Sequence, residues 1–337
     1  MPKLVPADEL FPHQIPEPLR QVEGRHEHWR ESYYFGMHPR DRVGDARVDD
    51  AIILTFAHYP LREMLDSHQF SLIDGKRLFA HITRPYGDAP HTSVIGPVSV
   101  EIVEPFKRLH LRGGAGDTPI AFDVTFEART LPYALRRGTM KRGDEIIWDQ
   151  SHFLQSGTYN GSYVVDGVER PIVDWWGQRD HSWGIRDHAR CPMWLWLAIQ
   201  LPDGMFGVWH WEYSNGARVF TDGCYAPADG GEPTPVIDFR HDLHWIDEHG
   251  APADYGADGS ATHGLAGRVE FVLEGGRTIA VEGQGPRAAS YGPFGGGQHI
   301  LAVRTDDGRE GTAIYELTGS YHHRYFPIPR ADRYPPG

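Results

Sequence analysis

The sequence predicts an all-β fold in two barrel-like halves, and three observations support this prediction. Gly and Pro are frequent, with 39 and 26 among 337 residues, and 12% of the chain is aromatic. This composition is typical of short strands joined by many turns. Apolar and polar residues also alternate: within residues 120–128, Phe122, Val124 and Phe126 face one way and polar residues the other, as in an antiparallel strand with one face in water. The third observation is the regular recurrence of turn-forming dipeptides.

These turns are clearest in the second half of the chain. Asp203-Gly204 and Asn215-Gly216 are hairpin signals, because Gly accepts the positive φ that tight primed turns require. Eight short β-branched or aromatic segments lie between such signals, at residues 195–201, 206–213, 218–220, 236–246, 268–273, 278–282, 299–304 and 312–317. Eight strands at this spacing predict a closed or nearly closed antiparallel barrel.

The first half gives a similar pattern. Residues 1–19 are rich in Pro and predict an extended arm with little regular structure. Strands are expected at residues 51–56, 98–103, 106–111 and 120–128, and a short helix at residues 61–68. The basic stretch 131–150 is interpreted as a loop, and residues 152–159 as the last strand of this half or the one that crosses to the next.

The charge balance excludes several classes of partner. The formal net charge is −13, which disfavours nucleic acid and anionic membranes, because phosphate groups require a clustered basic face. No run reaches the roughly 18 apolar residues of a membrane span, and the first residues show no signal-peptide pattern. Two cysteines, Cys191 and Cys224, are too few for a disulfide framework and are expected as thiols or as one bridge. We therefore expect a cytoplasmic protein that can form a homodimer.

Residues 174–188 form the most unusual stretch of the chain, because three Trp, two His, two Arg and three carboxylates occur within it. In an extended chain Arg179, His181 and Trp183 share one face, and Asp180 lies on the other. One interpretation is a buried network of Arg and Asp that ties two sheets together. The alternative is a catalytic site, since clustered ionisable groups also mark functional sites.

In that functional interpretation Asp180 or His181 acts as the acid or base, and Arg179 or Arg186 orients it. Indole rings would form the walls of the pocket, because they exclude water and their π faces stabilise a cationic intermediate. The candidate wall residues in this stretch are Trp175, Trp176 and Trp183.

A second constellation comprises residues 193–197, in which Trp and Leu alternate, and residues 209–213. In a strand, Trp209, Trp211 and Tyr213 share one face, while His210 and Glu212 share the other. We interpret these five residues as substrate-binding or catalytic candidates, although core packing for the indoles and a solvent-exposed His and Glu pair are alternatives.

The sequence does not predict a cofactor or a metal. The pair His241 and His244 has a spacing that metal ligands use, but it forms no recognised set with a third ligand. No Gly-x-Ser-x-Gly elbow and no Gly-x-Gly-x-x-Gly after a strand occur, which argues against an α/β hydrolase and a dinucleotide enzyme.

Residues 177–187, with residues 164–167 upstream, resemble the lipocalin-like tandem β-barrel group that includes carotenoid 1,2-hydratase, tocopherol cyclase-like proteins and Diels-Alderases. The His and Trp two residues apart in the hydratase pattern are matched by His181 and Trp183. The resemblance implies two lipocalin-like (calycin-type) barrels side by side and a hydrophobic substrate near their junction. The hydratase pattern also has a Tyr-x-Asp pair on a following strand, which residues 206–213 lack, so Asp180 or Glu212 would supply the proton.

The resemblance and the strand pattern together divide the chain into an N-terminal arm (1–19), two barrels (20–165 and 166–325) and a C-terminal tail (326–337). The leading functional hypothesis is a cofactor-independent hydratase, cyclase or isomerase that acts by acid-base catalysis on a hydrophobic isoprenoid, polyene or prenylated aromatic. Asp180 would be the acid, His181 the base, Arg179 and Arg186 the orienting groups. The alternative is a carrier that binds such a molecule without converting it.

Overall fold

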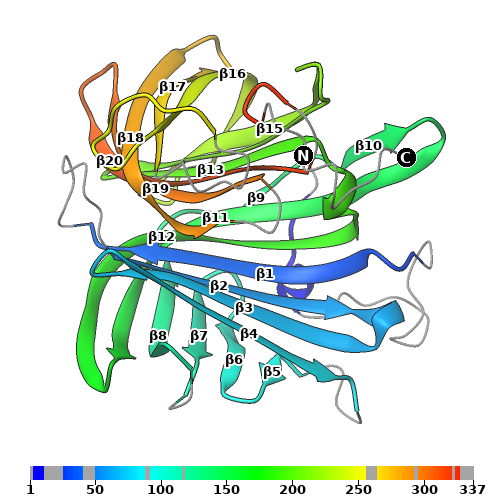
Figure 1. The fold of residues 1–337 in the computed structure, drawn as a ribbon, viewed down its shortest axis with the longest axis vertical. Coiled ribbons are helices and arrows are strands. Elements are labelled where there is room, and N and C mark those ends of the chain that lie inside the picture. Colours follow the sequence, from blue (N-terminus) through cyan, green and yellow to red (C-terminus); the bar gives the residue numbers. More distant parts are fainter. Residues whose placement is uncertain are drawn as a thin grey trace.

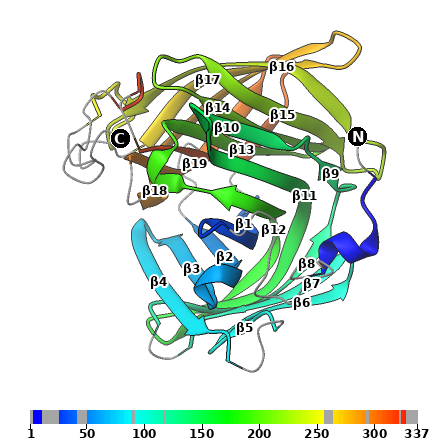
Figure 2. The same ribbon diagram turned by 90° about the vertical axis from the view of Figure 1, so that its right-hand side faces the viewer.

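The computed structural model describes residues 3–10, 26–40, 50–87, 92–115, 118–255, 264–291, 295–320 and 323–326. They form two antiparallel β bodies, one above the other (Figure 1). The predicted all-β class with two antiparallel barrels is therefore confirmed. Strands β1 (Trp29–His38), β11 (Glu145–Val165) and β12 (Val168–Arg186) form the side of the first body that lies toward the second barrel (Figure 1, Figure 2).

The first body is a strongly curved sheet whose path is β4-β3-β2-β1-β12-β11-β8-β7-β6-β5, with β9 and β10 added on β11. Its two edges approach each other, since Arg84 Nε on β4 donates to the Val94 carbonyl on β5 at 2.8 Å. The sheet is thus a nearly closed barrel. Its remaining strands are β2 (Ala51–Tyr59), β3 (Met64–Ile73), β4 (Lys76–Pro85), β5 (Val94–Ile95), β6 (Val98–Glu104), β7 (Arg108–Gly113), β8 (Ala121–Ala128), β9 (Tyr133–Ala134) and β10 (Gly138–Arg142).

Strands β11 and β12 form a long hairpin around the turn at Asp166 and Gly167. Both turn residues have positive φ, 52° and 76°, which a type I′ turn requires. The expected boundary between residues 165 and 166 falls in this turn. Strand β12 continues the first sheet by pairing with β1 and β11, and the second barrel begins at Met193.

The second body is a closed barrel of eight strands in sequence order, from β13 to β20. Each of the eight segments predicted in this half corresponds to one strand. The bounds are β13 (Met193–Leu201), β14 (Gly204–Glu212), β15 (Arg218–Pro227), β16 (Thr234–Ile246), β17 (Gly264–Leu273), β18 (Thr278–Tyr291), β19 (Gly295–Thr305) and β20 (Glu310–Gly319).

Strand alternation sorts the apolar residues into a core inside each barrel and a third cluster at the junction. On β13, Leu195 and Leu197 lie inside the second barrel, whereas Trp194 and Trp196 face outward and pack with Trp148 of the first body. The outward face of β13 is apolar because it covers the first sheet, so both faces of this strand are buried.

Two local predictions are wrong. Only Pro60–Arg62 form a 3₁₀ turn, and the rest of the expected helix belongs to β3, which pairs with β2 along its length. The expected loop at 131–150 contains β9, β10 and the first residues of β11. Arg136 and Arg137, between β9 and β10, pair with carboxylates of neighbouring strands. Arg137, for example, donates to both carboxylate oxygens of Asp149.

The N-terminal arm is partly described: Pro6–Glu9 form a 3₁₀ turn, Glu9 is buried, and residues 11–19 lie outside the described residues. The C-terminal tail beyond Phe326 also lies outside them. Both cysteines are buried free thiols. Within the described residues, no helix has the length and apolar character to cross a membrane.

Three fully buried histidines predict how stability depends on pH. Burial lowers the pKa of His38, His58 and His299 to about 4. In the unfolded chain these histidines therefore bind protons below about pH 6.5, whereas in the folded chain they bind them only below about pH 4. We expect the free energy of unfolding to fall between these pH values, by up to about 1.4 kcal/mol per pH unit for each histidine. Urea unfolding at pH 7 and pH 5 measures this loss, and equal values would contradict it.

Candidate active site between the two barrels

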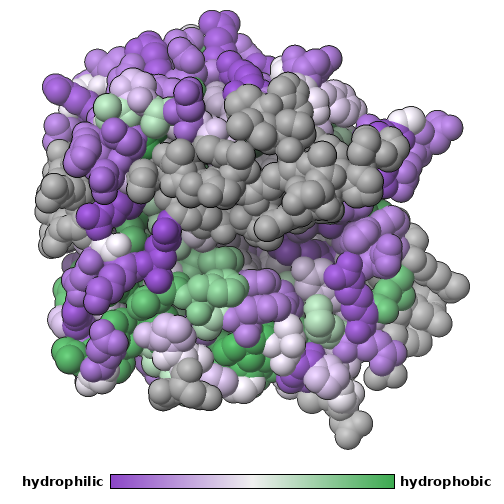
Figure 3. All heavy atoms as spheres, viewed as in Figure 1, coloured by the Kyte–Doolittle hydropathy of each residue, from purple (hydrophilic) through white to green (hydrophobic). Residues whose placement is uncertain are grey.

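A cavity of about 860 Å³ lies between the two bodies. Its lower wall comes from β1–β4, β11 and β12 of the first sheet, and its upper wall from the outer faces of β13, β14, β18, β19 and β20. On the face that Figure 3 shows, apolar side chains gather over the first sheet, while the second barrel is largely hydrophilic. A cavity of this size accommodates a small organic molecule.

Indole rings form much of the upper wall. Trp194, Trp196 and Trp209 point outward from β13 and β14, and Trp148 of β11 meets them from the first body. The ring centroids of Trp148 and Trp194 are 5.2 Å apart, as are those of Trp196 and Trp209. Such a wall excludes water and offers π faces to a developing positive charge.

Among the residues that the structure describes, Asp180 is one of two carboxylates that line the cavity. It projects from the face of β12 that is turned to the second barrel, and its Oδ1 lies 3.0 Å from Nε2 of His152 on β11. Burial lowers the pKa of His152, against the opposing effect of Asp180. The structure therefore places Asp180 in the cavity, beside the imidazole of His152.

Glu316 on β20 is the second carboxylate. Its Oε1 accepts a hydrogen bond of 2.8 Å from Trp194 Nε1, and its Oε2 one of 3.3 Å from Gln298 Nε2. Burial raises the pKa of Glu316, and the charge of Asp180 raises it further, while the two hydrogen bonds and Arg186 act against this. A carboxyl group with a raised pKa in an aromatic pocket is suited to donate a proton.

Arg186 supplies positive charge to the same space. Its guanidinium lies 5.5 Å from the ring of Trp209 and donates a hydrogen bond to Ser182. Burial, followed by the nearby charge of Arg30, lowers the pKa of Arg186 to about 9. Arg30 also lines the cavity and donates to Ser32 at 3.0 Å. Arg186 and Arg30 thus bring positive charge to the cavity that Asp180 and Glu316 line.

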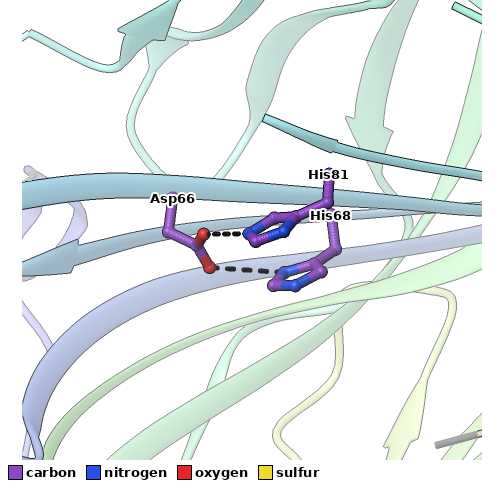
Figure 4. A group of neighbouring side chains, drawn as sticks. All are labelled: Asp66, His68 and His81. Atoms are coloured by element: carbon purple, nitrogen blue, oxygen red, sulfur yellow. Dashed lines mark hydrogen bonds and ion pairs between the residues drawn. The ribbon is translucent and has the colours of Figure 1, made fainter. Parts of the chain in front are cut away.

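A cluster of three polar residues, Asp66, His68 and His81, lies at the edge of the cavity on β3 and β4 (Figure 4). Asp66 accepts from His81 Nε2 at 2.6 Å with one oxygen, and its other oxygen lies 3.3 Å from His68 Nδ1. His68 lines the cavity. The two imidazoles stack with centroids 4.2 Å apart and planes 5° from parallel. Parallel rings do not direct their lone pairs at one point, so this trio is better suited to proton transfer than to holding a metal.

The other predicted residues of the central stretch face away from the cavity. Arg179 and His181 point into the first barrel and are fully buried. Arg179 forms a bidentate ion pair with Glu9, in which Nη1 and Nη2 donate to Oε1 and Oε2 at 2.6 Å each. His181 Nε2 contacts Glu31 Oε1 at 2.8 Å. Arg179 thus forms a buried ion pair with the N-terminal turn, and not the expected network with Asp between two sheets.

The three indoles of that stretch are also separate from the cavity lining. Trp175 packs in the core of the first barrel, and Trp176 lies under the guanidinium of Arg129, 4.9 Å from it. Trp183 is half-buried beside Ile185 and Trp29.

Successive side chains of β14 point to opposite faces, so the residues of the second constellation on this strand lie on two different sides, as predicted. Trp209 and Trp211 face the junction, and His210 points into the second barrel together with Glu212, away from the cavity. Tyr213 follows the strand, is exposed and donates to the Lys141 carbonyl at 3.1 Å.

Several lining residues were not among the predicted site residues, namely Glu316, Arg30, Trp148, Trp194 and Trp196. His152, also not predicted, lies behind the lining and stacks on Trp196. The indoles of the segment 193–197 gave a signal, because alternate Trp and Leu on a strand require an apolar partner on both faces. Glu316 gave none, since it is a single acidic residue in an apolar strand.

The model of a family of unknown function (DUF8625) matches residues 4–245. The chain belongs to this family. A comparison with curated protein sequences gives no significant match.

Solved structures share the fold. A Nitrosomonas europaea protein described as AttH matches with a TM-score of 0.61 and 13% identity, over 87% of this chain and 94% of that one. Kievitone hydratase from Nectria haematococca has a TM-score of 0.57 and 12% identity, over 86% and 89%. CghA has a TM-score of 0.55 and 11% identity, over 87% and 88%. The tandem-barrel architecture that the resemblance implied is thus confirmed.

Proposed function

We propose that the protein converts a hydrophobic small molecule by proton transfer in the cavity between the barrels, as a hydratase, cyclase or isomerase. One observation supports this above all: an indole-walled cavity of about 860 Å³ contains two carboxylates, Asp180 and Glu316, in different surroundings. Acid-base sites use such pairs, in which the surroundings of the two groups separate their pKa values. The fold shared with a kievitone hydratase is consistent with the proposal.

The proposed roles follow from the contacts. Glu316, whose pKa burial raises, donates its proton to a carbon–carbon double bond of the substrate. The resulting cation lies against the faces of Trp196 and Trp209. Water, or a nucleophile within the substrate, adds to the cation, and Asp180 accepts the proton that is released. Arg186 and Arg30 bind an oxygen-bearing end of the substrate, since guanidinium groups recognise carbonyl and acidic oxygens.

A direct test starts with the bound molecule. Lipid extracted from the purified protein is identified by mass spectrometry, and polyenes and prenylated aromatics are offered to the protein while products are followed by liquid chromatography and mass spectrometry. Conversion of a bound compound supports the proposal. Binding without conversion of any such compound indicates a carrier instead.

Replacing Trp196 with Ala is expected to weaken binding of such a compound about 10- to 100-fold, because a central aromatic contact contributes roughly 2 kcal/mol or more. Quenching of intrinsic fluorescence measures the affinity. Tyr213→Ala is the control, because Tyr213 is exposed and does not line the cavity. Equal affinities of both variants would place the ligand elsewhere.

A further inference from the structure

A second polar cluster lies inside the second barrel, on the opposite face of β14 from the indoles. His210 and Glu212 of β14 point inward together with His241 of β16. His323, from the segment that follows β20, meets them there. All four side chains are at least 91% buried, with 2%, 9%, 3% and 0% of their surfaces exposed.

Imidazole nitrogens converge on the carboxylate. The Nε2 atoms of His210 and His241 lie 3.1 and 3.0 Å from the same oxygen, Oε1 of Glu212. The potential ligand atoms of these three residues all lie within 4.8 Å of one another. Their rings are not parallel, since the planes of His210 and His241 differ by 66°. In contrast to the stacked pair His68 and His81, these rings can direct their lone pairs at a common point.

The Nδ1 atoms of His210 and His241, which face away from Glu212, contact hydroxyl groups, as the second ring nitrogen of a metal-binding His usually contacts a polar group. His210 Nδ1 lies 2.7 Å from Thr221 Oγ1, and His241 Nδ1 lies 2.7 Å from Tyr325 Oη. In metal sites such contacts fix the ring and leave Nε2 unprotonated for the metal. His323 contacts the other carboxylate oxygen, Oε2 of Glu212, at 2.9 Å, which would orient the carboxylate.

We propose that His210, Glu212 and His241 form a binding site for a divalent transition metal, with zinc as the best-suited ion, inside the second barrel. Two imidazoles and one carboxylate are a donor set that zinc commonly uses. His323 holds the outer oxygen of the carboxylate. The metal links β14 and β16 and, through His323 and Tyr325, the segment 323–326 that packs on the core of this barrel. Its role is structural and separate from the cavity.

A metal-free network is the alternative. In that network the rings of His210 and His241 both carry their proton on Nε2 and donate a hydrogen bond to Glu212. Their Nδ1 atoms then accept hydrogen bonds. Arg324 favours this arrangement, because its Nη2 lies 3.0 Å from His241 Nδ1 and can only donate. Arg324 is exposed, so metal binding requires it to turn toward solvent. The two states are therefore distinguished by metal content.

The test uses the full chain, purified without a histidine tag and without chelator, and its metal content is measured by inductively coupled plasma mass spectrometry. We expect about one equivalent of zinc per chain, and its near-complete loss in Glu212→Gln and in His241→Ala. His81→Ala, in the other His-rich cluster, should keep the metal. Substitution by Co²⁺ in the unaltered protein should give the absorption bands of a low-symmetry site with nitrogen and oxygen ligands.

The test remains decisive if a variant fails to fold, because the effects of chelation and of added Zn²⁺ are measured on the wild-type protein alone. Chelation should lower its Tm, and added Zn²⁺ should restore it. The proposal is overturned if the wild-type protein holds no metal and its Tm does not respond to Zn²⁺, or if Glu212→Gln and His81→Ala retain equal amounts of metal.

Discussion

Replacing Glu9 with Ala is expected to lower the free energy of unfolding by about 3–5 kcal/mol, because it leaves a buried guanidinium without its counter-charge. Arg179 and Glu9 are both completely buried, and the two carboxylate oxygens each accept a hydrogen bond of 2.6 Å from the guanidinium. Gln155 accepts two further bonds from Arg179 but carries no charge. Urea unfolding followed by circular dichroism measures the change.

Two further variants separate this ion pair from a general effect of the N-terminal turn. Asp8→Ala changes a neighbouring, partly exposed carboxylate that accepts from the Val5 backbone and caps the turn, and we expect a loss of only about 1 kcal/mol. Replacing Glu9 and Arg179 together with Met should recover much of the loss, since apolar side chains of similar volume often substitute for a buried pair. A loss below about 1 kcal/mol in Glu9→Ala would show that the pair does not stabilise the fold.

Sequence alternation predicted much of the fold because both barrels depend on short-range patterns. It also predicted correctly that Asp180 lies on the opposite face of its strand from Arg179 and His181. A turn, however, does not tell which sheet the following strand joins. The Asp166-Gly167 turn ends β11 without ending the first sheet, so strand pairing could not be deduced from it.

The site was predictable only where its residues are close in sequence. The partner of Arg179 lies 170 residues away, in the Pro-rich N-terminal segment, and nothing in the spacing of either segment connects them. The sequence spacing pairs His241 with His244, whereas the structure brings His241 of β16 to Glu212 of β14, two strands away in the barrel. His244 points to solvent. Cross-strand proximity depends on barrel closure, which local patterns do not encode.

Replacing Glu316 with Gln is expected to lower turnover about 10²- to 10⁴-fold, the range that a positioned general acid contributes. Gln keeps an oxygen for the hydrogen bond from Trp194, so the cavity and the binding of substrate should persist. Turnover and affinity for a converted compound are measured separately. Asp180→Asn should also lower turnover strongly with the fold retained, because it removes the group that accepts the released proton.

The pH profile identifies the role of Glu316 more closely than the rate alone. Burial raises the pKa of its carboxyl group, and only the protonated form donates, so turnover should fall as pH rises through this raised value. Glu316→Gln should abolish this dependence. Glu282→Gln is the matched control, since Glu282 is an exposed carboxylate on the same barrel, and its rate and profile should stay those of the wild type. If Glu316→Gln keeps the wild-type rate and profile, the proton comes from another group, and Asp180 with His152 becomes the donor to examine, because these are the next buried ionisable groups on the cavity side of β11 and β12.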